Sequence, residues 1–191
     1  MDALELKPGT YQGTYKLVGG RPSLDLVNTI SWPGTDRAHD WLDSVDNLQR
    51  WLKAVGLPRV AARHSSLEAA HEARATLAAV LRPLAHGERP THRAFERFNQ
   101  RLAQASARRV IDPATLSWTW KSPEQAADVF CALFLDAAEL LTTVNRDRLR
   151  HCPACDWLFV DQTRNGQRRW CDMADCGSRD KSRRYDQRTQ R

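Results

Sequence analysis

The sequence lacks the long apolar runs that a membrane-spanning helix requires. Its most apolar segment, VFCALFLDAAELL at 129–141, is interrupted by Asp136 and Glu139, and no run approaches roughly 18 apolar residues. The first residues, MDALELKPGT, lack the basic start and apolar centre of a secretory signal. We therefore expect a cytoplasmic protein that has no membrane partner.

Sequence motifs of the common enzyme classes are also missing. The chain has no phosphate-binding P-loop, no glycine-rich dinucleotide motif, no HExxH and no GxSxG. Five of the six histidines are scattered over segments that we expect to face solvent. The sequence therefore predicts a protein that is not an enzyme.

Cysteine is scarce outside one short segment. Four of the five cysteines lie within 25 residues, as the pair Cys152 and Cys155 and the pair Cys171 and Cys176. Two close pairs at this separation are typical of a four-thiolate zinc site, and His151 is a weaker candidate for one ligand. Disulfides or reduced buried thiols are the alternatives, and a cytoplasmic chain disfavours disulfides. Because four thiolates fill a tetrahedral shell, we expect one structural zinc ion, not a catalytic one.

Positive charge is concentrated in the same part of the chain. The net charge is +6, and residues 164–191 contain nine Lys and Arg against four Asp, whereas residues 1–163 contain 20 basic and 19 acidic residues. This asymmetry indicates a polyanionic partner, although a solvated, charged tail gives the same pattern. The candidate nucleic-acid-binding residues are Arg164, Arg168, Arg169, Arg179, Lys181, Arg183 and Arg184.

Apolar periodicity predicts a mainly α (α+β) fold. Helical patterns cover about 43–55, 66–85, 90–106 and 122–144, and a short β-hairpin is expected over 108–120. Further along, DWLFVDQTRNGQRRW predicts a hairpin with Asn165 and Gly166 at its tip, and the residues after Cys176 predict a basic helix capped by Ser178. We therefore expect a multihelical N-terminal domain with a small β-hairpin, residues 1–148, followed by a zinc-finger module of hairpin plus basic helix, residues 149–191.

Two polar residues, Asp25 and Asn28, interrupt an apolar segment near the start of the chain. They are candidate ligand-binding residues in a pocket for a small molecule. The alternative is that they satisfy buried backbone groups or cap a neighbouring helix.

Two stretches carry a family resemblance. CPACDWLFVDQTRNGQRRWCDMADCGSRDKSRR resembles the CGNR zinc finger, and GGRPSLDLVNTI resembles the start of the ABATE domain that usually precedes this finger in a bacterial family. The resemblance implies a stress-induced transcription regulator, with DNA binding inferred chiefly from basic residues. The family's four metal-binding cysteines fall on the four named above, and its signature tetrad falls on residues 176–179, where Ser178 replaces Asn. Because Ser and Asn cap helices almost equally well, we expect the fold to survive this change.

These features favour a DNA-binding transcriptional regulator whose N-terminal domain senses an unidentified small-molecule effector or mediates association. One alternative is a small-molecule-binding protein with a purely structural zinc module. Another is an RNA-binding protein, because Trp157 and Trp170 could stack on bases if they were exposed, although we expect both rings to be buried. A single finger buries little DNA surface, which leaves room for a homodimer, but no residue pattern specifies one.

Overall fold

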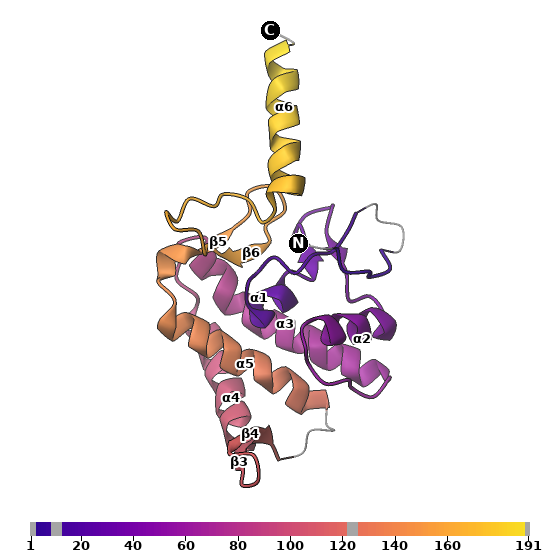
Figure 1. The fold of residues 1–191 in the computed structure, drawn as a ribbon, viewed down its shortest axis with the longest axis vertical. Coiled ribbons are helices and arrows are strands. Elements are labelled where there is room, and N and C mark those ends of the chain that lie inside the picture. Colours follow the sequence, from indigo (N-terminus) through magenta and orange to yellow (C-terminus); the bar gives the residue numbers. More distant parts are fainter. Residues whose placement is uncertain (1–2, 9–12, 122–125, 190–191) are drawn as a thin grey trace.

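The structure, a computed structural model, describes residues 3–8, 13–121 and 126–189 (Figure 1). Within these residues most of the regular structure is helical, and the strands form small two-stranded antiparallel sheets. The expected mainly α fold with small hairpins is thus confirmed. None of the helices in the described ranges is long and apolar enough to cross a membrane.

The helices and strands have the following bounds. The helices are α1 (Pro22–Val27), α2 (Val45–Ala54), α3 (His64–Ala85), α4 (His92–Arg108), α5 (Ala126–Thr143), the short 3-10 helix η1 (Arg146–Arg148), the π-helix η2 (Met173–Gly177) and α6 (Ser178–Thr189). The strands pair as β1 (Ile30–Ser31) with β2 (His39–Asp40), β3 (Arg109–Asp112) with β4 (Ser117–Trp120), and β5 (Leu149–His151) with β6 (Leu158–Val160).

Helix α3 lies at the centre of the helical body. It packs against α1, α2, α4 and α5, and its buried face includes Leu77, Val80 and Leu81, each fully excluded from solvent. Burying each such side chain contributes about 1.5–3 kcal/mol. The helix that the 3.6-residue apolar repeat predicts over about 66–85 is therefore confirmed.

The C-terminal segment is packed into the same hydrophobic cluster as the helices. Strand β6 contacts α1, and strand β5 contacts α3. Leu158 and Phe159 of β6 are completely buried and belong to the core that the N-terminal helices form. The division of the chain at residue 148 stays a prediction, and any boundary there crosses a continuous core.

The C-terminal hairpin differs from the one that the sequence predicts. Its strands are β5 and β6, and the tight turn between them carries the sequence CPAC, whereas the segment around Asn165 and Gly166 is a turn without paired strands. Among the described residues of that turn only Gly166 has a positive φ, of 60°, so the two-residue I′ turn is absent. The prediction of a hairpin at this point is wrong.

Helix α6 projects away from the body at the end opposite to the β3–β4 hairpin (Figure 1). Its main neighbour is η2, from which it continues without a break. The arrangement places the basic C-terminal helix where a large partner can reach it.

Candidate metal centre and nucleic-acid interface

The four cysteines of the C-terminal segment meet at one point. Each is buried, with no more than 4% of its surface exposed, and none forms a disulfide. The Sγ atoms of Cys155, Cys171 and Cys176 are 3.5–3.7 Å apart. With Cys152 included, all four sulfur atoms lie within 4.8 Å of one another.

This sulfur spacing fits one tetrahedral ion. Zinc–sulfur bonds of about 2.3 Å place the corners of a tetrahedron about 3.8 Å apart. The observed separations of 3.5–3.7 Å are close to that value. Four thiolate donors also complete the preferred coordination of zinc and leave no open position for a reacting molecule.

The first cysteine pair is held by the turn between β5 and β6. The amide of Cys152 donates to the carbonyl of Trp157 at 2.8 Å, and the amide of Asp156 donates to the carbonyl of Cys152 at 2.8 Å. Asp156 adopts a positive φ of 61°, which reverses the chain after Cys155. The turn thus presents both sulfur atoms on the same side.

The second pair is held by a capped π-helix. Asp172 is the N-cap of η2, and its carboxylate accepts a hydrogen bond from the amide of Ala174 at 2.9 Å. Cys176 lies in this helix, and Gly177 follows where a Cβ atom would approach Cδ1 of Trp170 to 3.2 Å. The absence of a side chain at Gly177 therefore leaves room for the side chains of Met173 and Trp170.

Ser178 is not the helix cap that the sequence predicts. Its backbone is helical, with φ −63° and ψ −46°, because η2 runs directly into α6 and the cap lies six residues earlier at Asp172. The Ser178 side chain is exposed. Ser in place of Asn at this position therefore changes the surface and does not remove a cap.

The sulfur cluster requires positive charge. Hydrogen bonds with Cys152, together with burial, raise the pKa of Cys155 and of Cys171, so the four thiols do not all ionise without a compensating cation. The guanidinium of Arg179 donates to Sγ of Cys176 at 3.4 Å and forms an ion pair with Asp175 at 3.0 Å. Arg179 therefore offsets part of the thiolate charge, as a bound divalent ion also does.

The loop between the two cysteine pairs is ordered by a buried carboxylate. Asp161 is 2% exposed and accepts hydrogen bonds from the amide of Thr163 at 2.9 Å and from the amide of Arg168 at 2.8 Å. Although burial raises the pKa of Asp161, the hydrogen bonds from the hydroxyl of Thr163 and from these two amides lower it overall. Because the side chain of Asp161 binds these amides, they are not available to a strand ladder, which explains the missing hairpin.

Two known families match this chain, one over the helical part and one over the C-terminal segment that contains the four cysteines. The profile of the ABATE family, described as "Putative stress-induced transcription regulator", matches residues 20–144, and the CGNR zinc finger matches residues 148–189. The chain belongs to the ABATE family. Comparison with curated proteins gave no match. The four buried cysteines of this ABATE protein lie in its CGNR zinc finger and form a site for one zinc ion.

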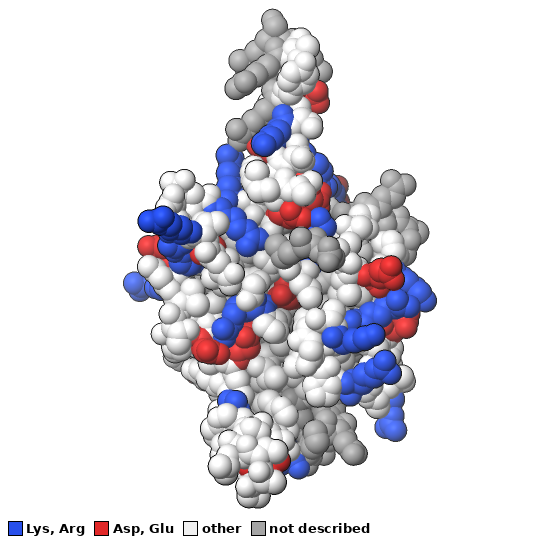
Figure 2. Space-filling model, in the orientation of Figure 1, with Lys and Arg blue, Asp and Glu red and all other residues white. Residues whose placement is uncertain are grey.

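The basic candidates have different surroundings in the ABATE protein. Arg164, Arg169, Lys181 and Arg183 are exposed, and Figure 2 shows Lys and Arg side chains around the base of α6, with acidic side chains between them. Arg183 forms an ion pair with Asp180 at 2.9 Å. The side chain of Arg184 lies outside the described part of the structure.

Arg168, in contrast, bonds to backbone carbonyls within the protein. Its guanidinium donates to the carbonyls of Trp170 at 3.0 Å and Val18 at 3.2 Å, and also to that of Cys171. It also lies over the ring of Phe159, 4.3 Å from the ring centre. These contacts tie the finger to the N-terminal segment.

Asp25 and Asn28 serve backbone groups. Oδ1 of Asp25 accepts from the amide of Gly19 at 2.8 Å. The side-chain amide of Asn28 donates to the carbonyl of Leu158 at 2.8 Å and accepts from the amide of Leu158 at 2.7 Å. These contacts fit the alternative that the sequence also allows, in which both residues satisfy buried backbone groups, and ligand binding by them stays a prediction.

A docking network that sequence analysis did not find surrounds the first cysteine turn. Arg82 of α3 forms an ion pair with Asp156 and donates to its carbonyl at 2.9 Å. The rings of His86 and His151 stack 3.7 Å apart, and Nε2 of His86 lies 2.8 Å from Oδ1 of Asp156. On the other side, Nε1 of Trp32 donates to the carbonyl of Ala154 at 2.8 Å.

Proposed function

We propose that this ABATE protein is a DNA-binding transcription regulator whose zinc finger holds a basic surface against the duplex. The observation that carries the proposal is that the exposed basic residues lie on two segments, the loop before Cys171 and helix α6, which are both connected to the sulfur cluster. Cys171 ends the loop that carries Arg164 and Arg169, and Cys176 lies in η2, which continues directly into α6. One zinc ion bound by Cys152, Cys155, Cys171 and Cys176 fixes both parts of the surface relative to each other.

Helix α6 has the properties of a groove-binding element. It projects from the body (Figure 1), and Lys181, Arg183 and Tyr185 are exposed, Tyr185 to 70%. A helix that is polar on all sides gains little from packing within its own chain. An α-helix about 10–12 Å across fits the major groove, which is about 12 Å wide. We therefore assign α6 to the major groove of the duplex.

The loop beside α6 is suited to phosphate contacts. Residues 163–165 and 167–173 line a groove of about 590 Å³ that contains the exposed Arg164 and Arg169. Arg169 lies over the ring of Trp170, 4.8 Å from its centre, which restrains the guanidinium. We assign Arg164 and Arg169 to the DNA backbone, and we leave Arg168 in its structural position.

Duplex DNA fits this surface better than single-stranded RNA does. Sequence-tolerant binding of single strands relies on exposed aromatic rings that stack on bases. Trp157 and Trp170 are only 6% and 7% exposed, so neither ring offers such a platform. A family description that names a transcription regulator also supports a role other than that of an enzyme.

The ABATE domain then senses an effector or mediates association. The shared core supports a role in which the ABATE domain controls the finger, because Leu158 of the finger is packed among residues of the helical domain. A change in the helices therefore acts on the finger through direct contacts. A homodimer stays a prediction.

The test is the salt dependence of binding of the zinc-loaded chain to duplex DNA. If about four cations meet phosphates, log K against log salt has a slope near −3.6. The double variant Arg164→Glu/Arg169→Glu should reduce the magnitude of this slope by about 1.8. The matched control, Arg93→Glu/Arg97→Glu, reverses two exposed charges on α4 and should leave the slope unchanged. Equal losses in both variants, or no duplex binding at low salt, would contradict the proposal.

A further inference from the structure

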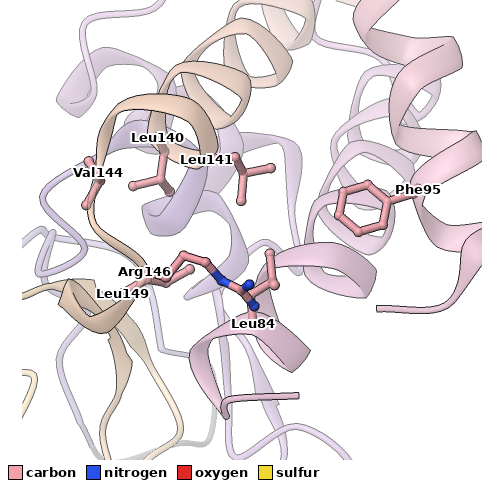
Figure 3. Close-up of a pocket in the computed structure, with 7 residues that line it drawn as sticks. All are labelled: Leu84, Phe95, Leu140, Leu141, Val144, Arg146 and Leu149. Carbon is pink, nitrogen blue, oxygen red and sulfur yellow. The ribbon is translucent and has the colours of Figure 1, made fainter. Parts of the chain in front are cut away.

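An apolar cavity of about 270 Å³ lies where three helices meet the start of the finger (Figure 3). Leu84 comes from α3, Phe95 from α4, and Leu140 and Leu141 from α5. Leu149, the first residue of β5, closes the side toward the finger. The cavity volume is just below the size range of small-molecule sites, roughly 300–1,000 Å³, so the cavity fits only a small ligand.

One charged side chain borders this apolar cavity. Arg146 of η1 reaches from beside Leu149 toward Leu84 (Figure 3). Within the described ranges its guanidinium has no hydrogen bond or ion pair, whereas the neighbouring Arg148 donates to the carbonyl of Asp161 at 3.3 Å and Arg150 to the carbonyl of Asp147 at 3.1 Å. A guanidinium at an apolar cavity provides a bidentate donor for a carboxylate.

We propose that this cavity binds a small monocarboxylate with an apolar body, the carboxylate on Arg146 and the body among the leucines and Phe95. The carboxylate accepts two N–H bonds from the planar guanidinium, and the body displaces water from the apolar lining. A neutral or cationic ligand of the same shape lacks the first interaction. The site therefore selects for both parts of the ligand.

The position of the site connects it to the finger. Arg146 and Leu149 flank Arg148, whose guanidinium also donates to the carbonyls of Thr163 and Arg164, in the loop that carries Arg164 and Arg169. A ligand that holds Arg146 and Leu149 in place therefore restrains the residue that holds this loop. The identification of the ligand as an effector rests on the DNA-binding function proposed above, whereas binding of the ligand does not.

The test is calorimetric titration of the full-length, zinc-loaded chain with a matched series of ligands. Octanoate carries the proposed body and head, octanol has the same body without charge, octylamine has the opposite charge, and acetate has the head alone. A parallel titration with 4-propylbenzoate distinguishes an aromatic body from an aliphatic one. We expect octanoate or 4-propylbenzoate to bind at least about tenfold more tightly than octanol, and acetate and octylamine not to bind.

Two variants separate the head from the body of the site. Arg146→Met, on the exposed 3-10 helix, should remove the preference for octanoate over octanol, whereas the control Arg97→Met on α4 should keep it. Val144→Phe should fill part of the cavity and weaken binding of every ligand, with thermal unfolding used to check that it folds. Undiminished octanoate binding by Arg146→Met, equal binding of octanoate and octanol, or no binding at millimolar concentration would overturn the site.

A second titration distinguishes this site from the proposed DNA-binding function. Duplex DNA affinity is measured with and without saturating octanoate or 4-propylbenzoate, whichever binds. A change in DNA affinity that Arg146→Met abolishes supports the effector role. An unchanged affinity removes that role. If no DNA binds at all, the calorimetric result still decides whether the carboxylate site exists.

Discussion

The side chain of Asn28 pairs with the backbone of Leu158 as a neighbouring strand would. Its Oδ1 accepts from the Leu158 amide at 2.7 Å and its Nδ2 donates to the Leu158 carbonyl at 2.8 Å. Both residues are completely buried. Asn28 of the ABATE domain thereby bonds to the edge of β6, where the amide of Val160 also donates to the carbonyl of Gly19 at 3.0 Å.

Asn28→Ala should destabilise the zinc-loaded protein by about 2–4 kcal/mol, because it leaves a buried N–H and a buried C=O of Leu158 without partners. Chemical denaturation measures the change. The control Asn99→Ala removes an exposed amide on α4 and should stay within about 0.5 kcal/mol of the wild type. If Asn28→Ala were equally mild, the pairing would not hold the finger.

Arg164 and Arg168 should separate DNA contact from stability. Arg168→Ala should cost about 1–3 kcal/mol in the free energy of unfolding, because it removes the donor to three backbone carbonyls. Arg164→Ala should change the stability little and reduce the magnitude of the salt slope of DNA binding by about 0.9. Denaturation and salt titration of both variants provide the measurements, and the opposite pattern would contradict the assignment.

Removal of zinc should loosen the finger before the helical body. The loop 161–170 leads directly into Cys171, and α6 continues from η2, which contains Cys176, whereas α3, α4 and α5 pack against one another. Hydrogen exchange after treatment with a chelator should therefore quicken over residues 161–189 and remain slow in α3. Unchanged exchange in the finger would show that the metal does not hold it.

Asp25 should make stability depend on pH. Burial raises its pKa from an ordinary 3.8 to about 7, although the hydrogen bond from Gly19 lowers it. The folded state therefore keeps a proton that the unfolded chain loses above about pH 4. The contribution of this proton to the free energy of unfolding is complete below about pH 4 and is lost as the pH rises to and through 7.

Asn in place of Asp25 keeps a carbonyl for Gly19 and does not ionise. Between pH 5 and pH 8 the stability of the wild type should fall relative to Asp25→Asn by roughly 2–4 kcal/mol. Urea unfolding at both pH values measures the difference. The control Asp186→Asn changes an exposed carboxylate on α6 and should follow the wild type, and an identical pH dependence for Asp25→Asn would contradict the raised pKa.

The sequence predicts those features that depend on local spacing. The two cysteine pairs have the separations of a four-thiolate site, and the long apolar repeats locate α3, α4 and α5. The turn at Gly166 is also a local feature, but its strands are missing because Asp161 binds the amide of Arg168, seven residues away. The sequence predicts a cap at Ser178 because the π-helix η2, which follows its cap Asp172, has no periodic signal in the sequence.

The contacts that dock the finger join residues far apart in the chain. Asn28 and Leu158 are 130 positions apart, and Arg82 and Asp156 are 74 positions apart. No local pattern in a single sequence specifies such pairs. The apolar cavity beside Arg146 also arises only when α3, α4 and α5 come together.

The measurement that tests the central claim most directly is duplex DNA binding by the full chain in its zinc-loaded, zinc-stripped and zinc-restored forms. The account predicts salt-dependent binding by the loaded protein, its loss when zinc is removed, and its recovery when zinc is returned. Binding of equal affinity and equal salt slope by the stripped protein would contradict a basic surface held in place by the four cysteines.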